Sequence, residues 1–557
     1  MMNNLKTFIK EKNLNGYIVP KNDEYFTEYS SNKNLSKLTA FTGSAGFALI
    51  LKKKNYLFVD GRYVLQANKQ SSTNFKIIQI PITWPKNLIT IKNTKIGFDP
   101  KLFTKKILMK YFGDCANLVP ISYNFKNKGV KNSNKFFQID KKITGESSKS
   151  KIKKLLKFMK EKKIDYLYLS ASENVCWTLN IRGSDLPNSP IANCKMIISI
   201  KGKIFLFSKL NKISLIKKKM KNINFLNEKD FFNTLCKLKK GNFCIDENTC
   251  SIFDQSLIES NFKVTHKIDP IYHLKSIKND VEIKNTLNSH ILDGIALTKF
   301  LFWFKKNEKI IDERKIEKKL EQFRKRSKFY MYPSFDTIAG SGPNGAIIHY
   351  KSTVKSNRRL KKNDILLIDS GGQYKWGTTD VTRTVCKGKI SSKIKNNFTR
   401  VLKGHIAVAN CNINKNYNGH LIDKLARKPL INVGLDYSHG TGHGVGFFLN
   451  VHEGPQSISK NNNILLKKGM ILSNEPGYYL KNKYGIRLEN LIYVDQIREK
   501  LIFKNLTFAP IDTDMINFNI LNKHEKKYLF DYHLEVYFRI SKFLNNSERK
   551  WLLSLLK

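Results

Sequence analysis

The fold is decided by a short apolar run that ends in a carboxylate, Asp364-Ile365-Leu366-Leu367-Ile368-Asp369-Ser370-Gly371-Gly372. After a short loop the chain resumes in extended, β-branched residues, Thr378-Thr379-Asp380-Val381-Thr382-Arg383-Thr384. A hairpin of this form places Asp369 and Asp380 side by side. Two adjacent carboxylates repel each other, so keeping both ionised requires a cation or a neighbouring base. The structural alternative is that one aspartate caps the turn while the other pairs with Arg383.

Further along lies a glycine-rich segment, His439-Gly440-Thr441-Gly442-His443-Gly444-Val445-Gly446. Four glycines in eight residues do not suit a helix, which excludes a helical pair of zinc-binding histidines, and the spacing does not match a phosphate-binding loop. The segment instead predicts a strand or loop that presents His443 where another backbone approaches closely. His452 follows within His452-Glu453-Gly454-Pro455. For either histidine, the structural alternative is an imidazole that only makes hydrogen bonds.

Two more carboxylates lie on predicted strands. Glu475 ends an apolar strand before a Pro-Gly turn, and Glu489 stands among apolar neighbours in Gly485-Ile486-Arg487-Leu488-Glu489-Asn490. Burying a glutamate is costly unless it is paired or bound to a metal. Because residues two apart face the same side of a strand, Glu489 could instead pair with Arg487.

The set as a whole favours a metal site over these separate alternatives. It comprises Asp369, Asp380, His443, Glu475 and Glu489. Hard, oxygen-rich ligands of this kind suit Mn²⁺, Co²⁺, Fe²⁺ or Zn²⁺. Four carboxylates match the charge of two divalent cations, which indicates a dinuclear site. Two metals that share a water lower its pKa and make hydroxide available near neutral pH, so the set predicts hydrolytic chemistry.

Composition narrows the class of protein. The 557 residues are 41% hydrophobic, which excludes wholesale disorder, and they indicate several domains. No apolar run is long enough for a membrane-spanning helix, no secretory signal is apparent at the start, and the eight cysteines show no CxxC spacing. We therefore expect a cytoplasmic protein without a membrane association.

The net charge of +54 comes from 99 basic against 45 acidic residues. Such a balance raises the question of nucleic-acid binding. However, the basic residues are mostly lysines spread along the whole chain, beside abundant Asn and Ile, rather than clustered with aromatic residues for stacking. Compositional bias explains the charge, and we expect no specific nucleic-acid partner.

The first half of the chain contains an internal repeat. The segments 16–59 and 165–207 each read as a buried strand, a polar region with Gly-Ser, and a β-hairpin. We interpret them as two copies of one α/β module, joined by a linker rich in Lys, Asn, Ser and Gly at 126–154. All 11 histidines lie at or after His266, so we expect these two modules to supply no imidazole.

A third region opens near Lys275. Apolar residues at Ile283, Leu287, Ile291 and Ile295 have helical spacing, strand-like runs follow, and the stretch from about Phe503 to the end reads as mainly helical. The predicted domains are 1–135, 150–272, 276–500 and 501–557.

At this point the sequence resembles the "pita-bread" metallopeptidases, and among them the three-domain Xaa-Pro aminopeptidases (aminopeptidase P). The catalytic resemblance is carried by SFDTIAG (334–340), NGAIIHY (344–350), GTTDVTRT (377–384), HGTGHGVG (439–446), NVHEGP (450–455), EPGYY (475–479) and GIRLEN (485–490). Outside that region it is carried by FTGSAG (41–46) with DGRY (60–63), by NIRGSD (180–185), and by NLT (505–507) with PID (510–512).

The resemblance implies an α/β (α+β) fold: two similar N-terminal α/β modules, a pita-bread catalytic domain with a curved antiparallel sheet, and a helical C-terminal extension. It implies two metal ions, usually Mn²⁺, on the five predicted ligands. Asp380 and Glu489 would bridge the ions, Asp369 would complete one, and His443 with Glu475 the other. Glu475 would also accept a proton from the bridging water.

The resemblance also implies roles in substrate binding. His349 and His452 would orient the substrate and steady the tetrahedral intermediate, while His439 matches a third histidine. Arg62 matches an arginine placed near the active site of a neighbouring subunit in a homodimer, although a salt bridge within its hairpin is the alternative. The substrates implied are peptides with proline at the second position, cleaved at their first peptide bond.

Such a bond makes physical sense as a target. An Xaa-Pro bond is a tertiary amide without an N–H, so peptidases that need that group cleave it poorly.

Three alternatives remain: a prolidase-like dipeptidase, a methionine aminopeptidase, and a non-catalytic pita-bread protein that binds nucleic acid. The chain departs from the family in a lysine-rich junction at 117–134 and in its high charge.

Overall fold

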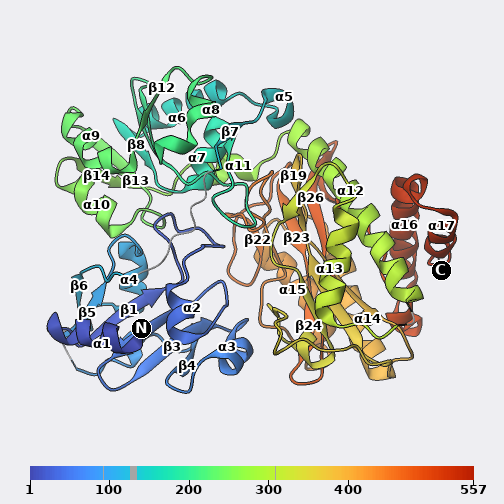
Figure 1. Cartoon of the computed structure of the whole chain (residues 1–557). Coiled ribbons are helices and arrows are strands. Elements are labelled where there is room, and N and C mark those ends of the chain that lie inside the picture. Colours follow the sequence, from blue (N-terminus) through green and yellow to red (C-terminus); the bar gives the residue numbers. More distant parts are fainter. Residues whose placement is uncertain (92, 126–133, 308, 557) are drawn as a thin grey trace. The chain divides into compact units, whose positions relative to one another are not determined.

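The computed structural model describes residues 1–91, 93–125, 134–307 and 309–556, and the chain forms two compact units, Met1–Tyr272 and His273–Lys557 (Figure 1). Over those described ranges, none of the helices has both the length and the apolar character that crossing a membrane requires. Part of the junction at 117–134 and the first part of the predicted linker fall on 126–133, outside the described residues.

The first unit begins with a six-stranded sheet in the order β4-β3-β2-β1-β5-β6. The central strand β1 is buried along its whole length, because the helices of this module pack on the sheet. The strands are β1 (Gly16–Pro20), β2 (Phe47–Leu51), β3 (Asn55–Asp60), β4 (Lys76–Ile80), β5 (Thr94–Phe98) and β6 (Ala116–Pro120). The helices are α1 (Met2–Glu11), α2 (Asn34–Thr39), α3 (Val64–Gln70) and α4 (Lys105–Phe112).

A second six-stranded sheet in the same unit has the order β12-β11-β10-β8-β13-β14. Its strands are β8 (Tyr166–Leu169), β10 (Lys195–Ser199), β11 (Ile204–Phe207), β12 (Ile223–Leu226), β13 (Asn242–Ile245) and β14 (Lys263–His266). When the strands of the two sheets are matched in chain order, their pairing is the same. In each sheet the first three strands form two antiparallel pairs, and the other three pairs are parallel. The prediction of two similar α/β modules is therefore confirmed.

The helices of this second module correct one sequence prediction. They are α5 (Lys141–Thr144), α6 (Ser148–Glu161), α7 (Ser172–Leu179), α8 (Ser214–Lys217), α9 (Phe231–Lys237) and α10 (Ile252–Glu259), and a short pair of strands joins β7 (Phe137–Gln138) to β9 (Ile181–Arg182). The predicted linker at 126–154 is thus wrong from Phe137 onward. Lysines dominate α6, yet Leu155 and Met159 are buried one turn apart and make it an amphipathic helix.

A second correction concerns histidine. His266 ends β14 in the first unit, where its Nδ1 lies 3.2 Å from Glu247 Oε1. The expectation that the first two modules supply no imidazole is therefore wrong for this residue.

The second unit is built on antiparallel strand pairs throughout its described part. Its sheets are β16-β17-β20, β15-β18-β19, β23-β26-β27, β24-β25 and β21-β22. The strands are β15 (Tyr330–Pro333), β16 (Ile338–Ser341), β17 (Ile365–Ser370), β18 (Gly372–Tyr374), β19 (Gly377–Thr378), β20 (Val381–Cys386), β21 (Gly442–His443), β22 (Ser457–Ile458), β23 (Ile471–Asn474), β24 (Gly477–Leu480), β25 (Tyr484–Arg487), β26 (Asn490–Ile497) and β27 (Lys500–Asn505).

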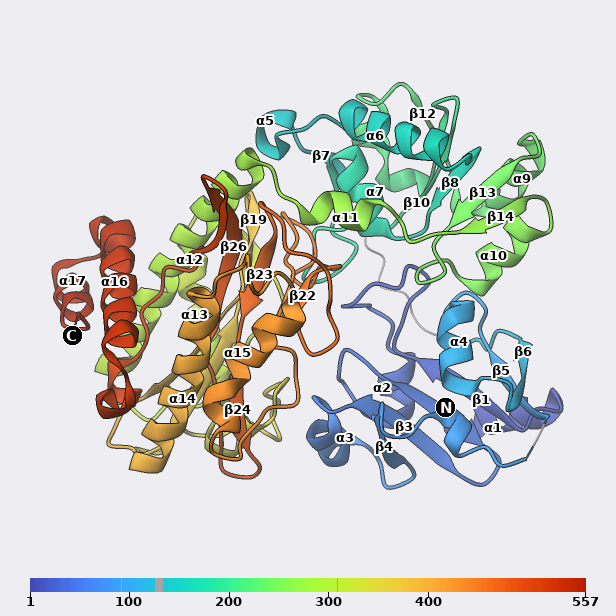
Figure 2. The ribbon, with the colours of Figure 1, turned by 180° about the vertical axis from the view of Figure 1, so that it is seen from behind.

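Helices pack on these sheets and form a shared apolar core that includes Phe398, Leu402 and Ile486. The long helix predicted from the spacing of Ile283 to Ile295 is α12. The helices are α11 (Ile271–Ser276, beginning in the first unit), α12 (Asp280–Lys306), α13 (Glu313–Arg324), α14 (Ser392–Ala409), α15 (Gly419–Ile431), α16 (Lys523–Ile540) and α17 (Asn546–Leu553). Figure 2 shows α16 and α17 beside α12 at the C-terminal end. The extension begins in β27, which pairs with β26, and two 3₁₀ turns (Thr513–Met515 and Phe518–Ile520) precede its first α-helix at Lys523.

Candidate metal centre

Two neighbouring strands bring the predicted aspartates together. Asp369 lies near the end of β17 opposite Thr382 of β20, and Asp380 directly precedes β20. The intervening residues form β18 and β19, which turn the chain back. The side-by-side arrangement predicted from the hairpin is confirmed. Arg383 does not pair with either aspartate: its guanidinium donates to backbone carbonyls, Asn490 and Tyr532.

The other three predicted residues come from strands that are distant in sequence. Glu475 follows β23, and its N–H donates to Thr441 O at 2.8 Å, just before His443 on β21. Glu489 stands between β25 and β26, and its N–H donates to Thr382 O at 3.1 Å. Backbone hydrogen bonds therefore connect each ligand-bearing segment to another, so the site rests on strand pairing rather than on a loop.

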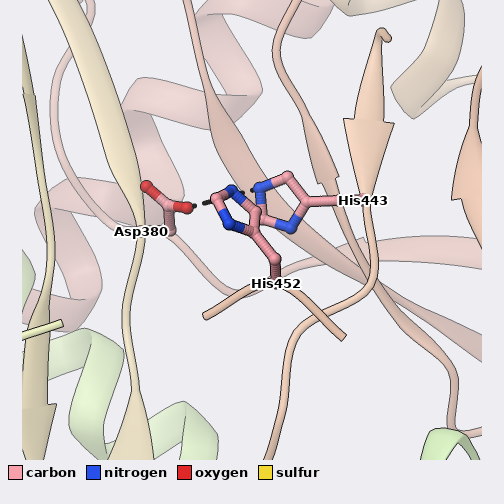
Figure 3. Close-up of side chains that lie close together, drawn as sticks. All are labelled: Asp380, His443 and His452. Carbon is pink, nitrogen blue, oxygen red and sulfur yellow. Dashed lines mark ion pairs between the residues drawn. The ribbon is translucent and has the colours of Figure 1, made fainter. Parts of the chain in front are cut away.

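The five side chains converge on one place. Asp369, Asp380 and Glu489 form one group whose ligand atoms lie within 4.8 Å of one another, and His443, Glu475 and Glu489 form a second. A third group with the same limit contains Asp380, His443 and His452. Figure 3 shows this third group, with the His452 ring drawn in front of the dashed line that joins His443 to Asp380. Asp380, His443 and Glu489 each belong to two of the three groups, so the groups overlap in one place.

Charge in this cluster is out of balance. Four carboxylates lie together, and Arg487 Nη2, 2.6 Å from Asp369 Oδ2, supplies an ion pair to one of them. Burial raises the pKa of Asp369 to about 6; Arg487 opposes this rise, while Asp380 and Glu475 add to it. Burial, Asp380 and Glu475 likewise raise the pKa of Glu489 well above its ordinary value. The site therefore holds carboxylates that need more positive charge than the surrounding protein provides.

Two buried oxygens in the cluster lack a donor. Within the described residues, Asp369 Oδ1 and Glu489 Oε1 accept no hydrogen bond. A buried acceptor left in this state is costly unless a cation satisfies it. The donor set, the charge and the free oxygens fit hard divalent cations.

The orientation of His443 also suits a metal ligand. Its Nδ1 donates to Gly444 O at 2.9 Å, and its Nε2 faces Asp380 Oδ2 and Glu475 Oε1, 3.5 and 3.4 Å away. Burial opposes protonation, but these two carboxylates raise the pKa of His443 to about 9. A carbonyl that fixes the outer nitrogen of a metal-binding histidine is a recurrent arrangement.

Arg487 has a different partner from the one its spacing allowed. It pairs with Asp369 and not with Glu489, because β25 ends at Arg487 and the strand alternation does not continue to Glu489. Arg487 Nη1 also donates to the Tyr479 hydroxyl at 2.7 Å, which lies 2.9 Å from His439 Nε2. His439 is therefore joined to the predicted ligand Asp369 through Tyr479 and Arg487.

The remaining predicted residues lie outside the three groups. His349 follows a 3₁₀ turn (Gly342–Ala346) that packs on β25, and the neighbouring Ile348 O lies 3.5 Å from Arg487 Nη2. Arg62 belongs to the first unit, where it forms a forked ion pair with Asp60, Nη2 to Oδ2 at 2.8 Å and Nε to Oδ1 at 3.0 Å. The hairpin salt bridge considered for Arg62 is thus present.

Sequence reasoning missed three buried carboxylates that hold the loops carrying the site histidines. Glu313 accepts hydrogen bonds from Ser341 N and Tyr350 OH, both at 2.7 Å, on either side of His349. Asp423 accepts from Thr441 Oγ1 at 2.6 Å and pairs with Arg427, whose Nη2 donates to His439 O at 2.6 Å. The third is Glu453, next to His452.

No local pattern could have identified these carboxylates. Glu313 opens α13 as an ordinary first-turn acid, and Asp423 with Arg427 reads as a helical pair four residues apart. For Glu453 the sequence did offer one indication, its position directly after His452 in the motif His452-Glu453-Gly454-Pro455.

Fold and cluster together define a metallopeptidase of the M24 type. The model for metallopeptidase family M24 matches residues 284–496, and that for the C-terminal region of this peptidase matches 499–555. Two models for the creatinase/prolidase N-terminal domain match 1–127 and 127–282.

Relatives narrow the assignment. A probable Xaa-Pro aminopeptidase P of Laccaria bicolor is 35% identical, over 98% of this chain and 91% of the relative. Xaa-Pro aminopeptidase 1 of Dictyostelium discoideum is 34% identical, over 99% and 95%. The crystal structure of X-prolyl aminopeptidase from Caenorhabditis elegans, described as a cytosolic enzyme with a di-nuclear active site, has a TM-score of 0.91 at 30% identity, covering 98% of this chain and 95% of that one. The chain belongs to the Xaa-Pro aminopeptidase family.

Proposed function

We propose that this protein is a metal-dependent aminopeptidase that hydrolyses the first peptide bond of peptides with proline at the second position. The observation that carries the proposal is the convergence of two aspartates, two glutamates and one histidine, from five separate strand ends, within two overlapping ligand groups. The chain matches proteins named as Xaa-Pro aminopeptidases along nearly its whole length, which supports peptides with proline at the second position as the substrates.

Five residues would hold two divalent metal ions. Asp380 and Glu489 would bridge, Asp369 would complete one site, and His443 with Glu475 the other. We propose Mn²⁺ as the native metal; Zn²⁺, Co²⁺ and Fe²⁺ suit the same hard ligands. When bound, the two ions would polarise the scissile carbonyl and lower the pKa of a water.

The protein's own residues would then manage protons and orientation. Glu475 would accept the proton of the attacking water; its Oε1 accepts a hydrogen bond from Ser473 Oγ at 2.9 Å, which fixes the carboxylate. His452, beside His443, and His349 would orient the substrate and donate hydrogen bonds to charge that develops on the carbonyl oxygen. His439, joined to Tyr479, would contribute to substrate binding.

Further parts of the proposal concern assembly and location. We propose a homodimer in which Arg62, released from or shared with Asp60, approaches the site of the neighbouring subunit. We place the enzyme in the cytoplasm, and we divide the chain into domains at 1–135, 150–272, 276–500 and 501–557.

The test is release of the first residue from an Arg-Pro-Pro peptide by purified protein, with Mn²⁺ or with a chelator. We expect release with Mn²⁺ and none with the chelator, and no release from a matched Arg-Ala-Pro peptide. A prolidase would instead prefer the dipeptide Arg-Pro. Absence of any release with each of the four metals would contradict the proposal.

A further inference from the structure

A second buried ionic cluster lies next to the candidate metal centre. Lys278 Nζ is 2.5 Å from Glu453 Oε1, and Lys275 Nζ is 3.2 Å from Glu453 Oε2. The side chains of Lys278, Glu453 and Lys275 are 0%, 1% and 2% exposed. Withdrawing three charges from water is costly, and apolar residues of similar volume would often be as stable. The arrangement therefore calls for an explanation beyond stability.

Glu453 is adjacent in sequence to a residue of the candidate site. His452 precedes it, and the His452 ring centroid lies 4.1 Å from that of His443, in an edge-on arrangement. The group in Figure 3 joins both rings to Asp380. Any shift of the Glu453 backbone would thus move His452 against a metal ligand.

The backbone of Glu453 is tied to the strand that bears His443. Its N–H donates to Gly444 O at 2.8 Å, and Gly444 N–H donates to Gln456 O at 3.2 Å. A side chain at position 444 would collide with Glu453 O, which a Cβ there would approach to 2.1 Å. Backbone bonding fixes how close the two segments lie, and leaves the direction of the Glu453 side chain to its two lysines.

The lysines themselves stand on a fixed support. Lys278 N–H donates to Gly469 O at 2.9 Å, Gly469 N–H donates to Val494 O at 2.8 Å, and Ile277 pairs with Met470 as an isolated bridge. These bonds hold the segment between α11 and α12 against β23 and β26, which flank Glu475 and Glu489. Glu453 is therefore anchored to the same sheet that carries two predicted ligands.

We propose that Glu453, held by Lys275 and Lys278, is a positioning residue. It keeps the His452 imidazole in the orientation in which it donates a hydrogen bond to the charge that develops on the substrate. The inference rests on the proposed function in that it assigns His452 a part in turnover. Glu453 touches neither substrate nor metal, and acts through the adjacent imidazole.

Glu453→Gln keeps the shape of the side chain and removes its charge. We expect kcat on Arg-Pro-Pro to fall by roughly 10- to 100-fold, the range found for groups that orient site residues, with KM and the two bound Mn²⁺ retained. Asp512→Asn is the matched control: it removes the buried partner of Lys305 (Nζ to Oδ2, 2.6 Å) in the same unit, away from the site histidines. We expect it to leave kcat unchanged.

A double-mutant cycle with His452→Ala separates positioning from a general structural effect. If Glu453 acts through His452, adding Glu453→Gln to His452→Ala causes no further loss of kcat, whereas independent effects multiply. Multiplying losses, loss of metal, or a fall no larger than that of Asp512→Asn would each overturn the proposal. If Glu453→Gln fails to fold, Lys278→Arg, which keeps the charge, and Lys278→Met, which removes it, replace it in the cycle, with the charge-keeping variant expected to retain activity.

A readout without turnover distinguishes this proposal from the proposed function. Diethyl pyrocarbonate modifies accessible imidazoles, and peptide mass spectrometry gives the rate at His452. We expect at least a severalfold change in that rate in Glu453→Gln and no change in Asp512→Asn. An unchanged rate overturns the positioning role even if the wild type cleaves no peptide, while absent cleavage with a changed rate counts against the peptidase alone.

Discussion

The candidate metal centre and the Glu453 cluster lie in the same unit, but their charge balance is opposite. Four carboxylates in the metal centre have Arg487 as the partner of Asp369, and two of their oxygens accept no hydrogen bond within the described residues. In the Glu453 cluster, by contrast, one carboxylate has two lysine partners. The lysines hold the pKa of Glu453 below its ordinary value, although burial opposes ionisation. The first cluster is short of positive charge without cations, whereas the second has two lysines for its one carboxylate. Buried charge thus marks a ligand site only where the protein leaves it uncompensated.

The largest effect that would break this comparison is expected at Asp380. Asp380→Ala should remove activity and bound metal together, because the proposed bridging ligand is lost. The same change should make the chelated protein more stable at pH 8, since it relieves repulsion among the carboxylates. Metal analysis of the purified variant and thermal unfolding in EDTA measure both. Retention of two metals would contradict the bridging assignment, and a less stable chelated protein would contradict the charge argument.

Glu475→Gln should separate chemistry from ligand charge. It removes the proposed proton acceptor while an amide oxygen remains, so we expect kcat to fall by about 10²- to 10⁴-fold. Stability should change little, because Ser473 Oγ can still donate to the amide oxygen. Steady-state kinetics and thermal unfolding check this. A variant that keeps wild-type turnover would assign the proton to another group.

Glu453→Ala should have the opposite effect on stability from Asp380→Ala. It leaves two buried lysines without their carboxylate, and breaking a buried pair in this way costs roughly 3–5 kcal/mol. Denaturant unfolding of the chelated protein gives the value. The double variant Lys278→Met with Glu453→Ala should recover part of the loss, because one unpaired charge is removed; no recovery would mean that packing, and not charge, is responsible.

The smallest effect concerns a buried group that is satisfied while neutral. His533 Nε2 accepts from Ile511 N at 3.0 Å and Nδ1 donates to Leu555 O at 3.0 Å; burial and the charge of Arg383 lower its pKa to about 4. In the unfolded chain this imidazole takes up a proton near pH 6.5, whereas in the folded chain it stays neutral down to about pH 4. The stability that the neutral His533 contributes is therefore lost as pH falls from about 6.5 to 4.

The matched variant is His533→Gln, which does not titrate. The difference in unfolding free energy between it and the wild type should shrink by about 3 kcal/mol over that pH interval, at about 1.4 kcal/mol per pKa unit. Measurements in EDTA remove the pH dependence of metal binding. A difference that stays constant with pH would show that His533 titrates normally.

Some features were predictable because their signal is local. An apolar strand ending in Asp369 can be read from adjacent residues, as can the repeat of strand and hairpin that gives the two modules of the first unit. The helix α12 follows from its spacing. In α6 the same logic failed, because lysines outnumber its apolar residues and one of them, Lys151, is buried with its Nζ on Trp177 O at 2.9 Å. Composition therefore suggested a linker where the structure has a helix.

The sequence by itself determined which chemical groups are available and on which strand ends they stand, since period and residue type are properties of neighbouring residues. Only the tertiary structure decided the pairing of those groups: Arg487 with Asp369, 118 residues apart, and Lys278 with Glu453, 175 apart. Such pairs depend on strand register and chain crossing, which no short segment encodes. Whether a buried carboxylate remains for a metal or is neutralised by the protein follows from that pairing.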